Sequence, residues 1–380
     1  MTATIEERPS RPAAIQARSI PSLDGLRAVA VVSVILGHSE GRALDSFPIL
    51  APFRRGEIGV ALFFVISGFL ITYLLLKEQD ETGDIHLQKF YFRRTLRIFP
   101  PFYAYVAVVG MLTAAGSFSV SAGAFLSALT YTWNFNNHRD LWIFGHLWSL
   151  SLEEQFYLIW PTCLVYLSRG VLLQAALISL CLAPVARILM FLLVPTLQKS
   201  LHLTLFLLPD HFLMGCLMAL ASRGNAYEGV FRAVVRPQYA TLGTLYLFIA
   251  GPILNHHYRA FRPLIGYSCE AVCIGIVLAY VVSRPASWPG RFLNLRIVRH
   301  IGVISYSLYL WQQMFTGPET ARGGGFPINL GLILGCAELS YWMIERPSIR
   351  WRMKFRGNSA PAAVDRNFSC PVQFSDSSPI

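Results

Sequence analysis

The chain has 380 residues, of which 54% are hydrophobic, 13% aromatic and only 14% charged. Soluble globular proteins carry roughly 25% charged residues, so this composition excludes a soluble enzyme, a nucleic-acid-binding module and a disordered protein. The net charge of +11 then indicates lysines and arginines concentrated in cytoplasmic loops, together with sites for phosphate-bearing small ligands, rather than a nucleic-acid surface.

Ten apolar runs follow one another along the chain, each close to the ~20 residues with which a helix crosses a bilayer. With both termini in the cytoplasm, most of the 32 lysines and arginines fall in cytoplasmic segments, as the positive-inside rule requires. We therefore predict an all-α, polytopic membrane bundle of about ten transmembrane helices. The runs are 28–44, 58–76, 100–117, 147–168, 171–195, 200–222, 237–255, 263–283, 301–317 and 326–344.

The ends of the chain differ from its centre in composition. We expect a disordered cytoplasmic N-terminus at 1–19, a transmembrane domain at 20–350 and a disordered basic C-terminal tail at 351–380. A short apolar stretch at 120–133 is predicted to be re-entrant or a surface hairpin, because counting it as a span spoils the charge pattern.

Two polar residues share one face of the first predicted span. Arg27 and His38 are eleven residues apart, which is almost a whole number of helical turns and ~16 Å along the axis. Arg27 would lie at the cytoplasmic rim and His38 at or beyond mid-membrane. A histidine near its ordinary pKa can abstract a proton at neutral pH, but an intramembrane histidine is also often structural.

Further charged residues stand before or within later spans. Arg94 and Arg97 share a helix face beside Arg93, and they suit either a phosphate ligand or lipid headgroups. Glu153 enters the fourth span from the side toward which His38 points and could orient it, although an acidic helix N-terminus explains Glu153 and Glu154 equally. Asp210 interrupts the sixth span. For three others we favour interhelical hydrogen bonds or side chains that snorkel to the membrane interface: Arg187, Glu270 and Glu338.

Six segments resemble, in order, the acyltransferase-3 family of bacterial membrane O-acyltransferases. The resemblance covers about residues 19–348 and implies a bundle of about ten helices in the bacterial cytoplasmic (inner) membrane. The segments are SLDGLRAVAVVSVILGH, GEIGVALFFVISGFLIT, FYFRRTLRIFPPFY, HLWSLSLEEQFYLIWP, ISYSLYLW and YWMIERP.

The resemblance also assigns expected roles. It implies His38 and Glu153 as catalytic, choosing Glu153 over Glu154, and Arg27, Arg94 and Arg97 as the acyl-CoA site. The chain departs from many members at Ala61 and Leu208, and at Gln312, where a histidine is common. Possible acceptor or supporting residues are Asp24, Trp148, Ser149, Tyr157 and Asp210.

The reaction implied is transfer of an acyl group, usually acetyl, from cytoplasmic acyl-CoA to a hydroxyl of a carbohydrate acceptor. Surface or exported polysaccharide, lipopolysaccharide, peptidoglycan, a lipid-linked oligosaccharide and a macrolide-like metabolite all remain open as acceptors. A transporter of a glycan or metabolite is the alternative, since intramembrane His, Glu and Arg also form proton relays; a non-catalytic scaffold is a third. No metal site is expected, because the nine histidines show no ligand spacing.

Overall fold

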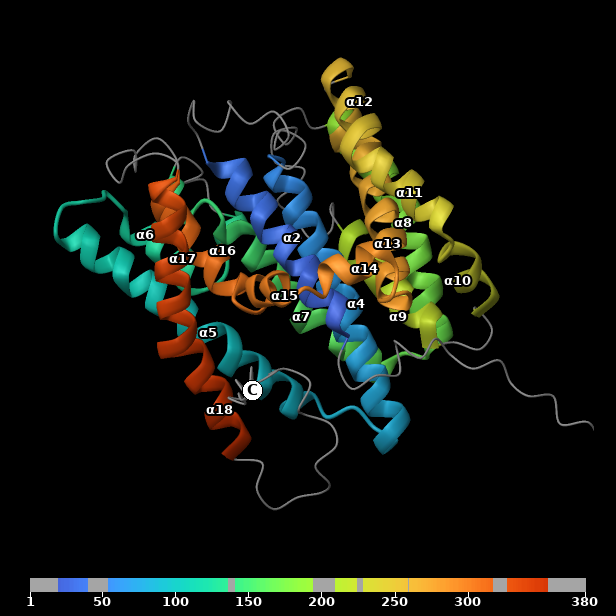
Figure 1. Ribbon diagram of the computed structural model, residues 1–380, viewed down its shortest axis with the longest axis horizontal. Coiled ribbons are helices and arrows are strands. Elements are labelled where there is room, and N and C mark those ends of the chain that lie inside the picture. Colours follow the sequence, from blue (N-terminus) through green and yellow to red (C-terminus); the bar gives the residue numbers. More distant parts are fainter. Residues whose placement is uncertain are drawn as a thin grey trace, which may run out of the picture.

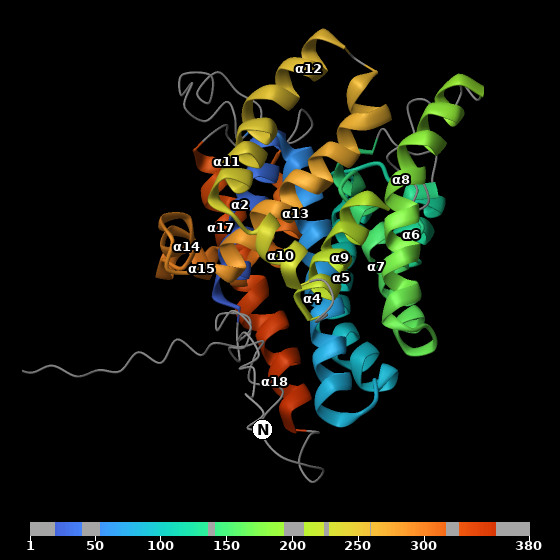
Figure 2. The same ribbon diagram turned by 90° about the vertical axis from the view of Figure 1, so that its right-hand side faces the viewer.

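The computed structural model describes residues 20–39, 54–135, 141–193, 209–223, 228–258, 260–316 and 327–354. These residues form helices joined by turns and short loops, and no strand occurs among them. The longer helices run side by side, and the short α14 and α15 lie across them (Figures 1 and 2). The helices from the N-terminus to the middle of the chain are α2 (Pro21–His38), α4 (Gly56–Thr82), α5 (Leu87–Ala114), α6 (Ala122–Leu129), α7 (Leu147–Tyr166), α8 (Arg169–Leu193) and α9 (Asp210–Arg223).

The second half of the chain contains shorter helices, several of them continuous with a π-helical turn. The α-helices are α10 (Glu228–Val234), α11 (Pro237–Leu245), α12 (Gly251–His257), α13 (Tyr267–Ser283), α14 (Trp288–Leu293), α15 (Arg296–Val303), α16 (Ser305–Phe315), α17 (Ile328–Ser340) and α18 (Arg346–Lys354). The π-helical turns are η6 (Tyr246–Ala250), η7 (Arg262–Gly266) and η9 (Tyr341–Glu345), and 3₁₀ turns occur at η2 (Trp133–Phe135) and η3 (Trp142–Phe144).

Four of the described helical stretches are long and apolar enough to cross a membrane: α4, α5, α8 and the stretch Arg262–Ser283. The prediction of an all-helical membrane protein is therefore confirmed, whereas ten spans and cytoplasmic termini stay predictions. Some expected spans are divided or partly described. The run 301–317 is interrupted between α15 and α16, and much of 200–222 lies outside the described residues.

The structure describes the expected terminal segments only in part, and it describes the stretch 120–133 in full. Residues 1–19 and 355–380 lie outside the described residues, and α18 continues past the expected domain end at 350 as far as Lys354. Within 120–133 the only α-helix is α6, whose eight residues span ~12 Å, too short to cross a bilayer. A turn with Tyr131 at a positive φ of 54° follows α6, as expected for a hairpin.

Helix α4 lies at the centre of the bundle and packs closely against α9. A Cβ atom added at Gly68 would lie 2.0 Å from the carbonyl oxygen of Phe212, and one at Gly215 would lie 2.1 Å from that of Val65. Only glycine allows the two backbones to approach this closely. The ring of Phe212 stacks between those of Phe64 and Phe156, which connects α4, α9 and α7. This packing fixes the face of α7 that carries Glu153.

Candidate active site

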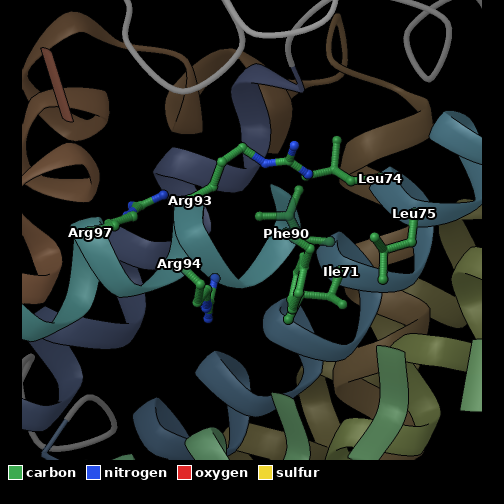
Figure 3. Close-up of a pocket in the computed structure, with 8 residues that line it drawn as sticks. Ile71, Leu74, Leu75, Phe90, Arg93, Arg94 and Arg97 are labelled. Carbon is green, nitrogen blue, oxygen red and sulfur yellow. The ribbon is translucent and has the colours of Figure 1, made fainter. Parts of the chain in front are cut away.

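A small pocket of about 50 Å³, partly open to solvent, lies between the second half of α4 and the first half of α5. Arginines of α5 line one side, and aliphatic residues of α4 line the other (Figure 3). Guanidinium groups beside an apolar wall suit a ligand with both phosphate and apolar parts. The lining residues are Leu70, Ile71, Leu74, Leu75, Phe90, Arg93, Arg94 and Arg97.

Glu153 contacts the arginines of this pocket through Arg94. We call Arg93, Arg94 and Arg97 the arginine group. The Nη2 atom of Arg94 lies 3.6 Å from Oε1 of Glu153, and the guanidinium stacks 3.5 Å above the ring centroid of Tyr157. The hydroxyls of Ser67 and Tyr157 both donate hydrogen bonds to the same carboxylate oxygen. Glu153 therefore fixes the orientation of Arg94 and holds α4, α5 and α7 together.

Arg27 and Glu345 complete the charged group. Arg27 lies within electrostatic range of Arg97, Glu153 and Glu345, and its Nη1 atom is 3.5 Å from Oδ1 of Asp24. Glu345 is buried, with 1% of its surface exposed, and accepts a hydrogen bond of 3.1 Å from the hydroxyl of Ser307. The three arginines expected to share one ligand are thus brought together from α2 and α5.

His38 lies at the opposite end of α2, and its partner comes from α16. Its Nδ1 atom is 3.1 Å from Oε1 of Gln312, and its ring packs edge-on against Trp142 at 5.5 Å between centroids. An amide oxygen can only accept, so Nδ1 carries the proton of a neutral ring and Nε2 keeps its lone pair. The described contacts of His38 and of Glu153 have no residue in common, so Gln312, rather than the expected Glu153, orients His38.

Gln312 is itself held by its neighbours. Its side chain is fully buried, and its amide nitrogen donates a hydrogen bond to Oε1 of Gln313 at 2.7 Å. The hydroxyl of Thr316 donates to the backbone and side-chain carbonyl oxygens of Gln312. Gln313 donates in turn to the carbonyl oxygen of Trp142 at 2.8 Å. This chain of hydrogen bonds fixes the histidine ring against α16 and η3.

The three supporting residues expected on α7, which are Trp148, Ser149 and Tyr157, contact different parts of the bundle. The ring of Trp148 packs edge-on against Phe64 at 6.2 Å between centroids. The hydroxyl of Ser149 bonds with that of Tyr309 and donates to the carbonyl oxygen of His146 at 2.9 Å. Ser149 thus belongs to the end of the bundle that holds His38, whereas Tyr157 belongs to the arginine group.

Asp210 lies apart from both groups. It is fully buried and paired with the equally buried Arg187, and the hydroxyl of Ser268 donates to its Oδ1 atom at 2.7 Å. Arg187 of α8 forms the expected interhelical bond with Asp210 of α9, and Glu338 of α17 bonds with His300 of α15. Glu270 bonds with Arg262 at 3.0 Å within its own helical stretch, Arg262–Ser283, and lies 3.7 Å from Arg55, which precedes α4. Satisfied on every side by protein groups, Asp210 has the surroundings of a structural residue.

Within the described parts of the chain, no group of three or more His, Cys, Asp or Glu residues could hold a metal ion. A family model described as an acyltransferase domain matches residues 20–337. The chain belongs to the acyltransferase-3 family. Both the arginine group and His38 lie on elements within the matched region.

Curated relatives carry acetyltransferase names. The chain is 28% identical to the peptidoglycan O-acetyltransferase OatA of Listeria monocytogenes, over 86% of this chain and 55% of that protein. It is 31% identical to the putative peptidoglycan O-acetyltransferase YrhL of Bacillus subtilis, over 87% and 55%. A putative O-acetyltransferase of Staphylococcus aureus is 29% identical over 89% and 60%. The chain therefore spans little more than half the length of these relatives. No solved structure matches it.

Several residues of the candidate site were not assigned a role from the sequence. Glu345 and His146 lie inside segments that carry the family resemblance, Gln312 directly follows one of them, and each is a buried polar residue. The signal that could have found them is a polar side chain within or beside an apolar run. Ser67 gave a weaker signal, because serine is common in membrane helices.

Proposed function

We propose that this chain is a membrane O-acyltransferase that moves an acyl group, acetyl in the first instance, from cytoplasmic acyl-CoA to a hydroxyl of a carbohydrate acceptor. Family membership and the acetyltransferase names of the relatives support the reaction class. We place the protein in the bacterial cytoplasmic membrane, with the pocket between α4 and α5 on the cytoplasmic side.

The observation that carries the proposal is the arrangement of charges along α2. Arg27 lies near the arginine group of α5, and His38 lies eleven residues further, ~16 Å along the axis. Arg94, Arg97 and Arg27 would hold the phosphates of the coenzyme with charge-assisted hydrogen bonds. The extended pantetheine arm would then carry the thioester from that group toward the level of His38.

His38 would act as the general base. Its Nε2 lone pair takes the proton of the acceptor hydroxyl while the hydroxyl oxygen attacks the thioester carbonyl carbon. Gln312 keeps the ring in the required tautomer, because Nδ1–H donates to its amide oxygen. Glu153 would act on the donor side, where it orients Arg94 and balances part of the positive charge.

The relatives' names make peptidoglycan the first acceptor to test. Because the chain spans little more than half of those proteins, other surface or exported polysaccharides, lipopolysaccharide, lipid-linked oligosaccharides and macrolide-like metabolites belong in the same test. No specific contact in the described residues favours a transporter.

Mass spectrometry of the host's surface glycans tests the proposal. A deletion strain would be compared with strains complemented by the wild type or by His38→Ala. Loss of an O-linked acetyl mass on deletion, restored by the wild type but not by His38→Ala, is the expected result. An unchanged set of glycans and exported metabolites in the deletion strain would contradict the proposal.

A further inference from the structure

His146 is a buried histidine whose ring has no hydrogen-bond partner among the described residues. It lies just before α7 with 2% of its surface exposed, and both Nδ1 and Nε2 are unpaired. A neutral imidazole always carries one N–H donor, and leaving a buried donor without an acceptor costs free energy. The ring is thus positioned to donate to a group that the described residues do not supply.

A second unpaired donor packs against the same tyrosine. The Nε1–H of Trp311 is buried and has no acceptor among the described residues. The ring of Tyr105 packs edge-on against His146 at 5.4 Å and against Trp311 at 5.5 Å between centroids. An indole N–H can only donate, so both residues offer donors around one buried ring.

The backbone and neighbours of this pair are firmly held. The hydroxyls of Ser149 and Tyr309 lie 2.9 and 3.2 Å from the carbonyl oxygen of His146, to which both can donate. Trp311 directly precedes Gln312, the hydrogen-bond partner of His38. Fixed backbones with unpaired side-chain donors are characteristic of a preorganised site rather than of a loosely packed one.

The two hydrogen-bond donors also lie at the height in the bundle that the thioester of the acyl donor would reach. His146 is within electrostatic range of His38. Along α7 it stands seven residues, about 10 Å, from Glu153 of the arginine group. An acyl-CoA anchored by its phosphates at those arginines would therefore present its thioester between the arginine group and His38.

We propose that His146 and Trp311 form the oxyanion hole of the acyl transfer, an inference that rests on the proposed function. The acceptor oxygen bonds to the thioester carbonyl carbon, and its proton passes to Nε2 of His38. The carbonyl oxygen becomes an anion that accepts hydrogen bonds from the two N–H groups. Collapse of this intermediate breaks the C–S bond, and the coenzyme leaves as a thiolate that takes the proton back from His38.

The test measures transfer of label from [14C]acetyl-CoA in inside-out membrane vesicles that contain the full-length protein and their own acceptors. Trp311→Phe removes only the N–H and keeps the ring, and His146→Phe removes both ring nitrogens. Each should lower the maximal rate of base-labile labelling about 10²-fold or more, the usual effect of losing one oxyanion-hole donor. The KM for acetyl-CoA should stay close to the wild-type value.

Controls separate catalysis from packing. Trp160→Phe removes a buried indole N–H that is already paired with Thr72 at 2.7 Å, and it should keep nearly the wild-type rate per folded protein. His146→Asn or His146→Gln, which return an N–H near Nδ1 or Nε2, should exceed His146→Phe in rate. Rates are normalised to folded protein from size-exclusion chromatography; if His146→Phe does not fold, Trp311→Phe decides alone.

Three outcomes are decisive. Wild-type rates in Trp311→Phe would overturn the oxyanion hole while leaving the acyltransferase proposal intact. A raised KM at an unchanged maximal rate would also overturn it, because it would assign these residues to donor binding. Absence of label with the wild type would overturn the proposed function and this inference together.

Discussion

Gln312 of α16 accepts a hydrogen bond from His38 of α2, with 3.1 Å between Oε1 and Nδ1. The two residues are far apart in the sequence, and both lie at the end of the bundle opposite the arginine group. A neutral amide at this position fixes the tautomer of the histidine without adding a charge. The family resemblance implies a histidine at this position, and this chain has Gln312 there, which contacts His38.

Gln312→Leu should lower the maximal rate of acetyl transfer ~10-fold, because the hydrogen bond that fixes the tautomer of His38 contributes ~0.5–1.5 kcal/mol. The KM for acetyl-CoA should not change, because the arginine group is untouched. Gln312→His, which returns a ring nitrogen able to accept from Nδ1–H, should recover part of the rate. Initial rates in membrane vesicles measure both, and an unaffected Gln312→Leu would show that the hydrogen bond has no catalytic role.

Arg94→Gln should raise the KM for acetyl-CoA by ~10-fold or more, because a hydrogen bond to a charged group contributes ~1.5–3 kcal/mol. Lys89→Gln is the matched control: it removes a positive charge from the exposed face of the same helix, outside the pocket. A KM equally insensitive to both changes would instead favour lipid headgroups as the partners of Arg94.

Glu153→Gln should reduce activity more than Glu154→Gln does. The amide oxygen still accepts from Ser67 and Tyr157, but the ion pair with Arg94 is lost. We expect a loss of ~10-fold for Glu153→Gln, in line with a charged hydrogen bond, and a clearly smaller loss for Glu154→Gln. Equal losses in the two variants would remove the distinction between these neighbouring carboxylates.

Asp210→Ala should reduce the amount of folded protein rather than alter acceptor choice. It leaves the fully buried charge of Arg187 without its partner, which costs ~3–5 kcal/mol. Replacing both residues by leucine should recover much of this stability, since the buried charge is removed too. Thermal denaturation in detergent measures the effect; a stable Asp210→Ala protein with altered products would restore Asp210 to the acceptor site.

The sequence allowed the residues within one helix to be related, but not the contacts between helices. Helical periodicity correctly predicted that Arg27 and His38 share one helix, α2, which ends at His38. It could not show that Glu153 faces Arg94, because that contact depends on how α4, α5 and α7 pack. The close glycine approach of α4 to α9 and the stacked ring of Phe212 fix that packing.

Residues that act as partners were the hardest to predict. Gln312 and His146 stand in or beside apolar runs, but a polar residue there does not show which side chain of another helix it contacts. Asp210 gave a strong signal, an acid within an apolar run, yet its partner Arg187 shows that such a signal also marks a buried structural pair.

The most direct measurement supplies [14C]acetyl-CoA to the cytoplasmic face of inside-out vesicles and follows base-labile label on their glycans. The wild type and the control His86→Ala, a histidine at the start of α5, should incorporate label equally. His38→Ala should incorporate at least ~10²-fold less, as expected for loss of a general base. Normal labelling by His38→Ala, or labelling only when acetyl-CoA is offered to the outer face of right-side-out vesicles, would contradict the proposed reaction.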